Sequence, residues 1–394
     1  MKLSEIKSIA FLHYIFPGGG AEMVTINLAK MLKTKGIKVY VFVYDLDETK
    51  IPEEASNIEI IRMSYPVDRR NIPDIINNIK EKDISLLVFP TDVYDVLLYA
   101  DELRSKTDCK LLFMLHSLPF WDYYESKETK RYRTKGSILK QIEWYLLRSH
   151  KYTFGSKKRA LKRVYRECYN KVDVFGTLCE EYARDVAKAI GVQYENSKFR
   201  VLNNHIEINN QPVTPKQKEV CFIGRLSYWD KRPEHILRIW HLIEDRHPDW
   251  RLNILGTGPE REKLESLAKE LKLNRVQFLG YVANPQQYYD RASIVCLTSN
   301  YEGWGMALME AQSNQCAAIA FDCSAGVREI LSPSWENGVL INSFNEKAYA
   351  EAMSRLMNDT ELRDKVAKNG AVAVKRFSPE NTLRQWECML ESLK

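Results

Sequence analysis

The sequence predicts an α/β protein with two domains, each built on a doubly wound parallel sheet. Three observations lead to this prediction. Short runs of β-branched and aromatic residues, such as Lys38–Tyr44, alternate along the chain with helical patterns such as Val93–Arg104. The 394 residues with 45% hydrophobic content are enough for two cores of ordinary domain size. The polar stretch from Asn203 to Lys218 has the composition of a linker between them.

The first domain is expected to cover residues 1–205. Its expected strands are Ile9–Tyr14, Lys38–Tyr44, Ile58–Arg62, Ser85–Phe89, Cys109–Leu115, Val172–Phe175 and Phe199–Leu202. Helical patterns between them cover Ala21–Lys35, Asp74–Glu81, Val93–Arg104 and Glu180–Ile190. The beginning of the chain is interpreted as leading into the first strand and not as a signal peptide, because a proline and three glycines follow where a cleavage site would be needed.

The second domain is expected to cover residues 206–377, with a last helix in residues 378–394. Its expected strands are Glu219–Ile223, Leu252–Leu255, Gln277–Val282, Ser293–Leu297, Ala317–Phe321 and Val339–Ile341. Helices are expected from Pro233 to Asp245, from Met306 onward, at Gly326–Ile330, Glu346–Met357 and Glu361–Arg376. Ligands of doubly wound sheets bind outside the carboxyl ends of the strands, so the loops that follow these strands are the candidates for function.

Composition narrows the class of protein. The formal net charge is +6 and the sequence pI is about 8.7, which suits an anionic substrate or a membrane surface and does not demand nucleic acid. No apolar run is long enough to span a bilayer. The eight cysteines include no Cys-x-x-Cys pair and mostly lie in apolar runs. They indicate reduced core residues of a cytoplasmic protein, not a disulfide framework or a zinc site.

The stretch Thr298–Ala311 forms a strand–loop–helix corner around which the second domain is organised. Gly303 and Gly305 let the backbone turn tightly and approach a ligand, and the helix that begins near Met306 offers unpaired N–H groups to a phosphate. Glu302 lies in the loop, and the second carboxylate of the corner lies one turn into the helix. Two carboxylates thus flank a candidate anion site, although two surface carboxylates on an ordinary capped helix would give the same spacing.

Glu302 and Glu310, within the word Tyr-Glu-Gly-Trp-Gly-Met-x-Leu-x-Glu-Ala, resemble the Glu-x7-Glu signature of the large retaining glycosyltransferase family, group 1 or family 4. The resemblance is strongest over Cys221–Ile341 and looser in the first half. It implies the GT-B fold, in which two Rossmann-like domains face each other across a cleft. The second domain would bind the nucleotide sugar, the first domain the acceptor, and the last helix would cross back to the first domain.

Arg225 and Lys231 lie in one loop after an expected strand, where a forked donor and a point charge can neutralise a diphosphate. Exposed Arg and Lys are common, so the pair alone is weak evidence. The pattern Gly-Arg-Leu…Lys resembles the phosphate clamp of the family and assigns both residues, with Glu302, to the catalytic machinery. Arg232 stands where the family usually has a glycine, which leaves the shape of this loop open.

The loop after the first expected strand carries Gly19 and Gly20 directly before a helix, which suits the close approach of a phosphate or sugar. A tight turn without a ligand is the alternative, and the run does not match Gly-x-Gly-x-x-Gly, so no dinucleotide cofactor is indicated. Family resemblance assigns both glycines to donor binding. It also assigns a catalytic position near the transferred sugar to His116, although a lone histidine is commonly structural. Trp121, Tyr123 and Tyr124 follow, either to stack on an acceptor sugar or as local core.

Resemblance also supplies the remaining donor contacts. The backbone after the strand at residue 280 would pair with the nucleobase, and the central corner would hold ribose, phosphate and sugar. The donor-binding candidates in the second domain are Tyr281, Val282, Gly303, Trp304, Gly305, Met306, Ala307 and Glu310. No metal or cofactor is expected. Asp45-Leu46-Asp47 spells the Asp-x-Asp of metal-dependent glycosyltransferases, but it lies far in sequence from these residues and is interpreted as a solvated loop.

The segment from Lys127 to Arg166 carries fourteen Lys and Arg against two Glu, with apolar residues at helical spacing. A solvated helical face over the domain is the plain interpretation. Attachment to an anionic membrane that holds a lipid-linked acceptor is the second, and nucleic-acid binding is the third and weakest, because no motif supports it.

These expectations describe a cytoplasmic retaining hexosyltransferase, peripheral at the inner face of the cell membrane, that moves a sugar from a nucleotide diphosphate sugar to a saccharide or lipid-linked saccharide. The expected donor is a UDP-sugar such as UDP-Gal, UDP-Glc or an N-acetylhexosamine donor, and bacterial surface polysaccharide synthesis is the expected setting. A hydrolysing UDP-sugar 2-epimerase and a catalytically silent sugar-nucleotide-binding partner of another transferase remain alternatives. The sequence names neither the sugar, the acceptor, the linkage nor the oligomeric state.

Overall fold

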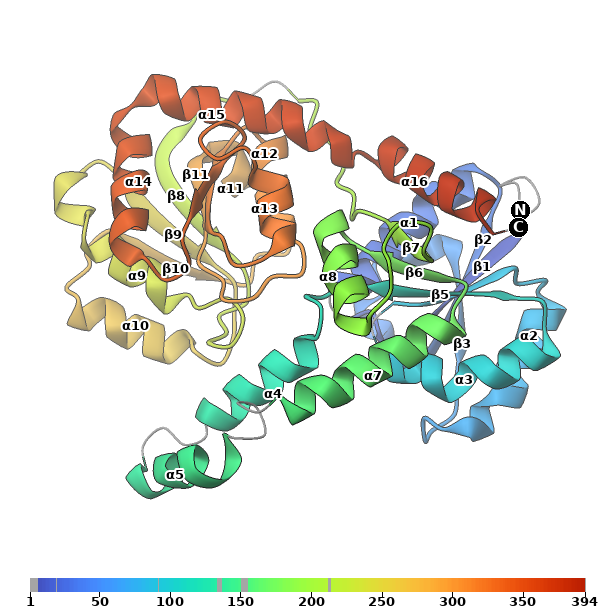
Figure 1. The fold of residues 1–394 in the computed structure, drawn as a ribbon. Coiled ribbons are helices and arrows are strands. Elements are labelled where there is room, and N and C mark those ends of the chain that lie inside the picture. Colours follow the sequence, from blue (N-terminus) through green and yellow to red (C-terminus); the bar gives the residue numbers. More distant parts are fainter. Residues whose placement is uncertain are drawn as a thin grey trace. The chain divides into compact units, whose positions relative to one another are not determined.

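The computed structural model describes residues 6–393 apart from Gly19, Thr91, 133–136, 150–154 and 212–213. The chain divides into two compact units. In Figure 1 the first unit is coloured from blue to green, with its last helix in red, and the second unit is coloured from yellow to red. The first unit consists of residues 1–205 and 379–394, and the second consists of residues 206–378. Each unit is a parallel sheet with helices on both faces, so the predicted α/β class is confirmed.

The first unit is organised around a seven-stranded sheet with the order β3-β2-β1-β4-β5-β6-β7. All its strand pairs are parallel, and β1 pairs with β2 in a register that places Ile9 opposite Val39. Buried strands of this kind need nearly continuous apolar sequence, as in Leu86–Phe89. The strands are β1 (Ser8–Phe16), β2 (Lys38–Leu46), β3 (Ile58–Arg62), β4 (Leu86–Phe89), β5 (Lys110–Leu115), β6 (Val174–Thr177) and β7 (Phe199–Val201).

Helices of the first unit cover both faces of this sheet with their apolar stripes. They are α1 (Gly20–Thr34), α2 (Ile72–Glu81), α3 (Val93–Lys106), α4 (Trp121–Tyr132), α5 (Ile138–Glu143), α7 (Ser156–Lys171), α8 (Glu180–Ile190) and α16 (Pro379–Glu391). The described part of the unit also contains four short helices: η2 (Glu48–Lys50), η3 (Glu53–Asn57), η4 (Arg69–Asn71) and the π-helical turn η5 (Trp144–Arg148).

The last helix, α16, packs within the first unit although it follows the second unit in sequence. Trp386 in this helix lies against Phe11 of β1, with ring centroids 6.4 Å apart. Gln385 accepts a hydrogen bond from the backbone N–H of Asn203 at 2.9 Å. Both a buried aromatic contact and a polar contact therefore fix the end of the chain on the first sheet.

The second unit is built on a six-stranded parallel sheet with the order β10-β9-β8-β11-β12-β13. The strands are β8 (Gln217–Ile223), β9 (Arg251–Leu255), β10 (Val276–Gly280), β11 (Ala292–Leu297), β12 (Ala317–Phe321) and β13 (Val339–Ile341). The helices are α9 (Glu234–His241), η6 (Glu244–Arg246), α10 (Arg261–Glu270), α11 (Gln286–Arg291), α12 (Met306–Ser313), α13 (Ala325–Leu331), α14 (Glu346–Asn358), α15 (Thr360–Ala373) and η7 (Val374–Phe377). Its core is separate from that of the first unit.

The basic segment 127–166 is described in part and forms helices α4, α5 and α7 with the turn η5. Helix α5 lies beyond the end of α4, away from the seven-stranded sheet (Figure 1). Its apolar side chains face solvent: Ile138 is 77% exposed, Leu139 80% and Leu146 of the following turn 70%. Among the described residues no helix combines the length and the apolar character needed to cross a membrane.

Candidate functional site

The predicted corner of the second unit is a fully buried strand, a tight loop and a short helix. Strand β11 is buried along its whole length, and Thr298 directly follows it. Gly305 directly precedes α12, and its φ is 99°. Residues other than glycine rarely adopt this backbone conformation. The loop also packs on the neighbouring turn so closely that a Cβ on Gly326 would lie 2.4 Å from the carbonyl oxygen of Gly303. The N–H groups at the start of α12 are thereby held in a fixed position.

Lys231 and Glu302 form a tight ion pair in this corner. The Nζ atom of Lys231 lies 2.6 and 2.7 Å from the two carboxylate oxygens of Glu302, and the side chains are only 20% and 11% exposed. Burial alone would lower the pKa of Lys231, but the charge of Glu302 and its hydrogen bond outweigh burial and raise it. The lysine is thus a fixed cation placed beside a carboxylate, and both predicted residues meet.

The loop that carries Lys231 also carries the second predicted cation. Arg225 is 68% exposed, and its Nη2 atom lies 3.0 Å from Oδ2 of Asp230. The backbone carbonyl of Asp230 accepts a hydrogen bond from the N–H of Asn300 at 2.7 Å, which ties this loop to the central corner. Asp230 was not among the sequence candidates, although its position next to Lys231 was the signal that could have found it.

Arg232 resolves the question of loop shape that the sequence left open. Its φ is 48°, in the left-handed region where glycine is the usual residue. The guanidinium lies 4.4 Å above the ring of Tyr228, and its Nε donates to Glu234 at 2.5 Å. The loop therefore keeps a glycine-type turn, and two side-chain contacts hold the arginine in it.

Glu310 lies on the first turns of α12 as predicted, but one of its oxygens already has a partner. Oε2 accepts a hydrogen bond from the hydroxyl of Tyr289 in α11. Burial raises the pKa of Glu310, and the hydrogen bond from Tyr289 opposes that effect. Tyr289 is a member of this site that the sequence analysis missed, because only the packing of α11 against α12 brings it there.

Glycines bring the loops after β8, β9 and β10 into backbone contact. A Cβ on Gly256 would lie 1.9 Å from the carbonyl oxygen of Gly224, and one on Gly258 would lie 2.3 Å from that of Leu226. The N–H of Gly256 donates to the carbonyl of Gly280 at 2.7 Å, which fixes the turn before the predicted base-binding residues. There Tyr281 is 77% exposed, so its ring and the neighbouring backbone are accessible to a ligand.

Other predicted donor residues contribute backbone to the corner. Trp304 is 3% exposed, its indole N–H lies 3.2 Å from the sulfur of Met309, and its ring packs edge-on against Phe377. Its side chain thus supports the loop. Met306 and Ala307 form the half-buried first turn of α12, and Val282 is half-buried beyond β10.

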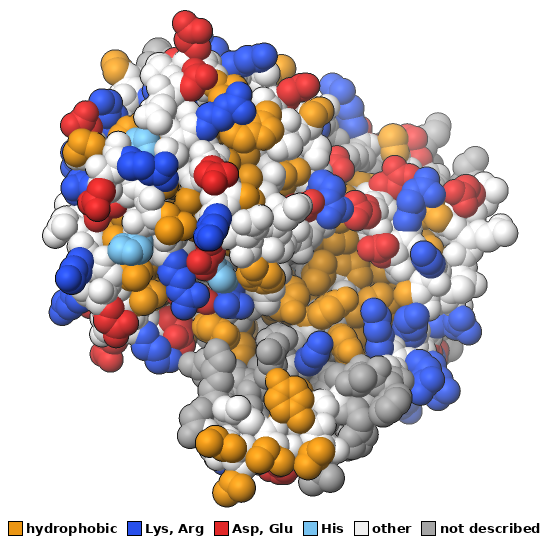
Figure 2. Space-filling model, turned by 60° about the vertical axis from the view of Figure 1, so that its left-hand side comes forward, with side chains coloured by type: hydrophobic (Ala, Val, Ile, Leu, Met, Phe, Trp, Pro, Cys, Tyr) orange, Lys and Arg blue, Asp and Glu red, His pale blue; other side chains and the backbone are white. Residues whose placement is uncertain are grey.

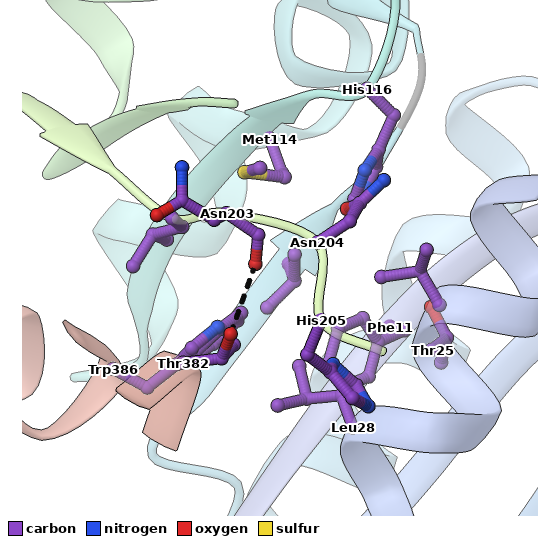
Figure 3. A pocket seen from close by; sticks show the side chains of 13 residues that line it. Phe11, Thr25, Leu28, Met114, His116, Asn203, Asn204, His205, Thr382 and Trp386 are labelled. Carbon is purple, nitrogen blue, oxygen red and sulfur yellow. Dashed lines mark hydrogen bonds between the residues drawn. The ribbon is translucent and has the colours of Figure 1, made fainter. Parts of the chain in front are cut away.

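In the first unit, His116 follows β5 and lines a small enclosed cavity, shown in Figure 3. Burial, reinforced by the positive charge that His13 can carry, lowers the pKa of His116 to about 4. The imidazole is therefore neutral at physiological pH. The amide of Asn204 lies beside the ring (Figure 3), and within the described part of the chain neither Nδ1 of His116 nor Oδ1 of Asn204 makes a hydrogen bond.

A second buried histidine supports this edge of the sheet. His13 in β1 is 1% exposed, and its Nε2 atom lies 2.9 Å from the hydroxyl oxygen of Thr25 in α1. Its Nδ1 atom lies 3.7 Å from Oε1 of Glu22. The sequence analysis missed His13, although its place near the carboxyl end of the first strand could have marked it.

The glycine loop is only partly described. Gly19 lies outside the described residues, while Gly20 is the first residue of α1 and a Cβ there would meet no atom within 4 Å. The aromatic group on α4 is partly packed on the core, with Tyr123 and Tyr124 edge to face at 5.4 Å.

The Asp-x-Asp sequence lies at the end of β2. Asp47 caps η2 and pairs with Lys50 at 2.6 Å, which lowers the pKa of its carboxyl group. Among the described residues no cluster of three His, Cys, Asp or Glu side chains could hold a metal ion.

Comparison with known proteins assigns a family to each half. The model of Glycosyltransferase Family 4 matches residues 18–210, and the model of Glycosyl transferases group 1 matches residues 204–372. The structure of Anabaena HepE, determined in complex with UDP and glucose, superposes with a TM-score of 0.75 at 19% identity and covers 98% of this chain and 100% of that one. This likeness shows the fold.

Two curated relatives extend the comparison. An uncharacterized glycosyltransferase of Haemophilus influenzae is 30% identical over 202 residues, 49% of this chain and 56% of that protein. The poly(glycerol-phosphate) alpha-glucosyltransferase of Bacillus subtilis is 25% identical over 301 residues, 75% of this chain and 43% of that protein. The chain thus spans about half the length of the curated relatives it matches.

Two Rossmann-like sheets, each with helices on both faces, define a protein of the GT-B fold. Within that fold the two matches follow one another and together span residues 18–372. Residues 18–210 thus form a domain of Glycosyltransferase Family 4, and residues 204–372 form a domain of the Glycosyl transferases group 1.

Proposed function

We propose that this chain is a retaining glycosyltransferase that takes a sugar from a nucleotide diphosphate sugar, with UDP as the nucleotide. The observation that carries the proposal is the Lys231–Glu302 pair beside the amino end of α12. A fixed cation and free helix N–H groups suit a diphosphate, and a carboxylate next to them suits sugar hydroxyls. UDP and glucose bound to HepE, which shares the fold, support the choice of donor.

The proposed reaction breaks the bond between the anomeric carbon and the diphosphate oxygen and forms a bond to an acceptor hydroxyl on the same face of the sugar. The leaving phosphate oxygen takes the proton of that hydroxyl, so atoms and charge balance. Arg225, Lys231 and the start of α12 stabilise the negative charge that develops on the diphosphate. Glu302 holds sugar hydroxyls, and Glu310 with Tyr289 holds the ribose.

His116 has a different proposed role. Because its pKa is about 4, the ring is neutral and donates or accepts a hydrogen bond without adding charge. A neutral ring next to a sugar orients a hydroxyl and leaves the proton transfer to the phosphate. Asn204 beside it positions the ring in this proposal (Figure 3).

The proposed acceptor is a saccharide, free or lipid-linked, in the assembly of a bacterial surface polysaccharide. The Bacillus subtilis relative acts in name on poly(glycerol-phosphate), a polymer of this general kind. A cytoplasmic enzyme that serves a lipid-linked acceptor must reach the inner face of the membrane.

We therefore include peripheral attachment to an anionic membrane, with α5 and η5 as its contact. Five large apolar side chains of this stretch are between 49% and 80% exposed: Ile138, Leu139, Ile142, Tyr145 and Leu146. Figure 2 shows apolar side chains gathered at this tip, at the bottom of the view. Helix α7 adds basic side chains, since its sequence contains seven Lys and Arg and one Glu. An apolar tip with neighbouring cations fits the interface of an anionic bilayer.

Sedimentation with vesicles tests the attachment. Leu139→Ser with Leu146→Ser should release the protein from vesicles of phosphatidylglycerol and phosphatidylcholine, and charge reversal at Lys157, Lys158 and Arg159 should do the same. Val372→Ser is a matched control, because Val372 on α15 is 70% exposed on the other unit. Sedimentation that none of these variants changes would exclude α5 as the contact.

A thermal-shift panel of nucleotides and UDP-sugars, followed by product analysis, tests the reaction. A ligand that binds only the folded chain raises its melting temperature. A shift with UDP and a larger one with one UDP-sugar are expected. Release of a free 2-epimer without any acceptor would instead identify an epimerase, and a Glu302→Ala protein with full cellular function would identify a silent partner.

A further inference from the structure

A lysine of the second unit joins the carboxyl ends of two helices. Lys216 directly precedes β8, in the polar stretch that the sequence predicts as a linker. Its Nζ atom donates hydrogen bonds to the backbone carbonyls of Tyr289, Asp290 and Asn314 at 2.7, 3.1 and 2.7 Å. Tyr289 and Asp290 lie in the last turn of α11, and Asn314 directly follows α12. The three N–H groups of one ammonium group thus bridge both helices.

The acceptors of this lysine explain why a cation is used. All three are carbonyl oxygens at the ends of helices, where the aligned peptide dipoles make the local potential negative. The carbonyl of Tyr289 also has a second donor, because Sγ of Cys316 lies 3.1 Å from it. Two side chains from outside α11 therefore fix the backbone of this helix at Tyr289.

A direct link between the two helices lies beside the lysine. Nε2 of Gln286 in α11 donates to Oδ1 of Asn314 at 2.5 Å. Nδ2 of Asn314 in turn donates to the backbone carbonyl of Glu310 in α12 at 2.9 Å. The end of α11 is thus attached to the helix that carries the second carboxylate of the donor corner.

The side chain of Tyr289 carries this fixed position to the carboxylate of Glu310. The tyrosine is 2% exposed, and its hydroxyl donates to Oε2 of Glu310. Burial raises the pKa of Glu310, and the hydrogen bond opposes that effect, so the hydroxyl favours the ionised carboxylate. Oε2 is occupied by this contact, which leaves Oε1 as the acceptor that the proposed function gives to a ribose hydroxyl.

We propose that Lys216 is a positioning residue of the donor site and sets its preference for a nucleoside diphosphate with free ribose hydroxyls. Lys216 holds the end of α11 beside α12, the hydroxyl of Tyr289 fixes the carboxylate of Glu310, and this carboxylate accepts a hydrogen bond from the ribose. The inference rests on the proposed function, because it assumes that Glu310 holds the ribose. It makes a linker residue a determinant of nucleotide selectivity.

Calorimetric titration of the full chain with UDP, 2′-deoxy-UDP and 3′-deoxy-UDP tests the inference. The wild type should bind UDP at least about tenfold more tightly than one of the deoxy analogues, which lacks the hydrogen bond to the carboxylate. Tyr289→Phe and Lys216→Met should each lower this ratio at least about threefold, because UDP binding weakens and analogue binding does not. The double variant should show the ratio of Tyr289→Phe alone, since both substitutions act on the same carboxylate.

Lys218→Met is the matched control, because Lys218 lies two residues further along and its pair with Asp249 is exposed. It should keep the wild-type ratio. Lys216→Gln retains two N–H donors and should show a smaller loss of the ratio. It replaces Lys216→Met in the test if the methionine variant does not fold.

Melting temperatures of all variants separate selectivity from stability. A lower melting temperature of Lys216→Met with the wild-type ratio would show a purely structural lysine and overturn the inference. Equal binding of UDP and both deoxy analogues by the wild type would also overturn it. UDP binding by the wild type would uphold the proposed donor in both cases, whereas absence of UDP binding would overturn the proposed function as well.

Discussion

The two units place opposite chemistry at the carboxyl ends of their parallel strands. The second unit concentrates charge there, with Lys231 and Glu302 paired at 2.6 Å in a partly buried corner. The first unit presents neutral groups there, including the uncharged His116 and the exposed ring of Tyr14, and its ion pair Asp47–Lys50 is more exposed than the Lys231–Glu302 pair. In the proposed function, one architecture thus serves two kinds of ligand. Paired charges and helix N–H groups suit a diphosphate, and neutral polar and aromatic groups suit an alcohol acceptor.

The strongest test of this contrast removes the cation from the second unit. Lys231→Met should lower turnover, measured as UDP release from a panel of UDP-sugars, by about 10²- to 10³-fold, because the charge on the leaving diphosphate loses its stabiliser. Lys218→Met is the control. Lys218 pairs with Asp249 at 3.0 Å, but both side chains are well exposed, so its loss should change little. A turnover of Lys231→Met equal to that of the wild type would contradict the catalytic role given to the charge of the second unit.

Backbone packing gives the second contrast. Gly256→Ala forces a Cβ to within 1.9 Å of a carbonyl oxygen at a φ of 136°, so we expect about 3 kcal/mol of destabilisation from strain and overpacking. Gly20→Ala in the first unit meets no atom within 4 Å and should change stability by less than about 0.5 kcal/mol. Urea unfolding of both variants measures the difference. Equal effects would show that close backbone approach is not special to the second unit.

The neutral histidine of the first unit predicts a pH dependence. The pKa of His116 is lowered to about 4 from its ordinary value of 6.5, so the unfolded chain binds a proton that the folded chain does not. Its contribution to stability is present above pH 6.5 and is lost as the pH falls toward 4. Between pH 7 and pH 5 the loss should be about 2 kcal/mol. His116→Asn should remove this slope in urea unfolding, and a slope unchanged by the substitution would contradict the assignment.

The smallest effect is expected at Arg232. Glycine would relieve the left-handed backbone at φ of 48° but would remove the contacts with Tyr228 and Glu234. The relief of backbone strain and the loss of the two contacts are each worth about 1 kcal/mol and oppose one another. Arg232→Gly should therefore change the free energy of unfolding by less than about 1 kcal/mol. UDP binding should be unchanged. A loss of UDP binding would show that the arginine is part of the charged site and not only of its loop.

The sequence predicted the strands of both sheets well, because buried parallel strands are continuous apolar runs. The run Ala317–Phe321, for example, has the same first and last residues as strand β12. Helix and strand ends were less certain. The predicted strand Gln277–Val282 ends at Gly280, where φ is 73°, and the helix expected to reach Asp245 ends at His241. Left-handed backbone and a short 3-10 turn after α9 leave little pattern in the sequence.

The candidate site was predictable where its residues are close to one another in the sequence. Glu302, Gly305 and the start of α12 form one corner, so adjacency in sequence was enough. Tyr289 and His13 were missed because their partners come from other elements. Periodicity also identified the apolar stripe of the basic segment, but only the structure shows that Leu139 faces solvent.

The central claim is that a diphosphate binds at the Lys231–Glu302 corner. Calorimetric titration of UDP into the wild type, Lys231→Met and Lys218→Met tests it most directly. We predict that the wild type and Lys218→Met bind UDP alike and that Lys231→Met binds at least tenfold more weakly, a loss of about 1.4 kcal/mol or more. Equal UDP affinity in all three proteins, or no binding to the wild type, would contradict the claim.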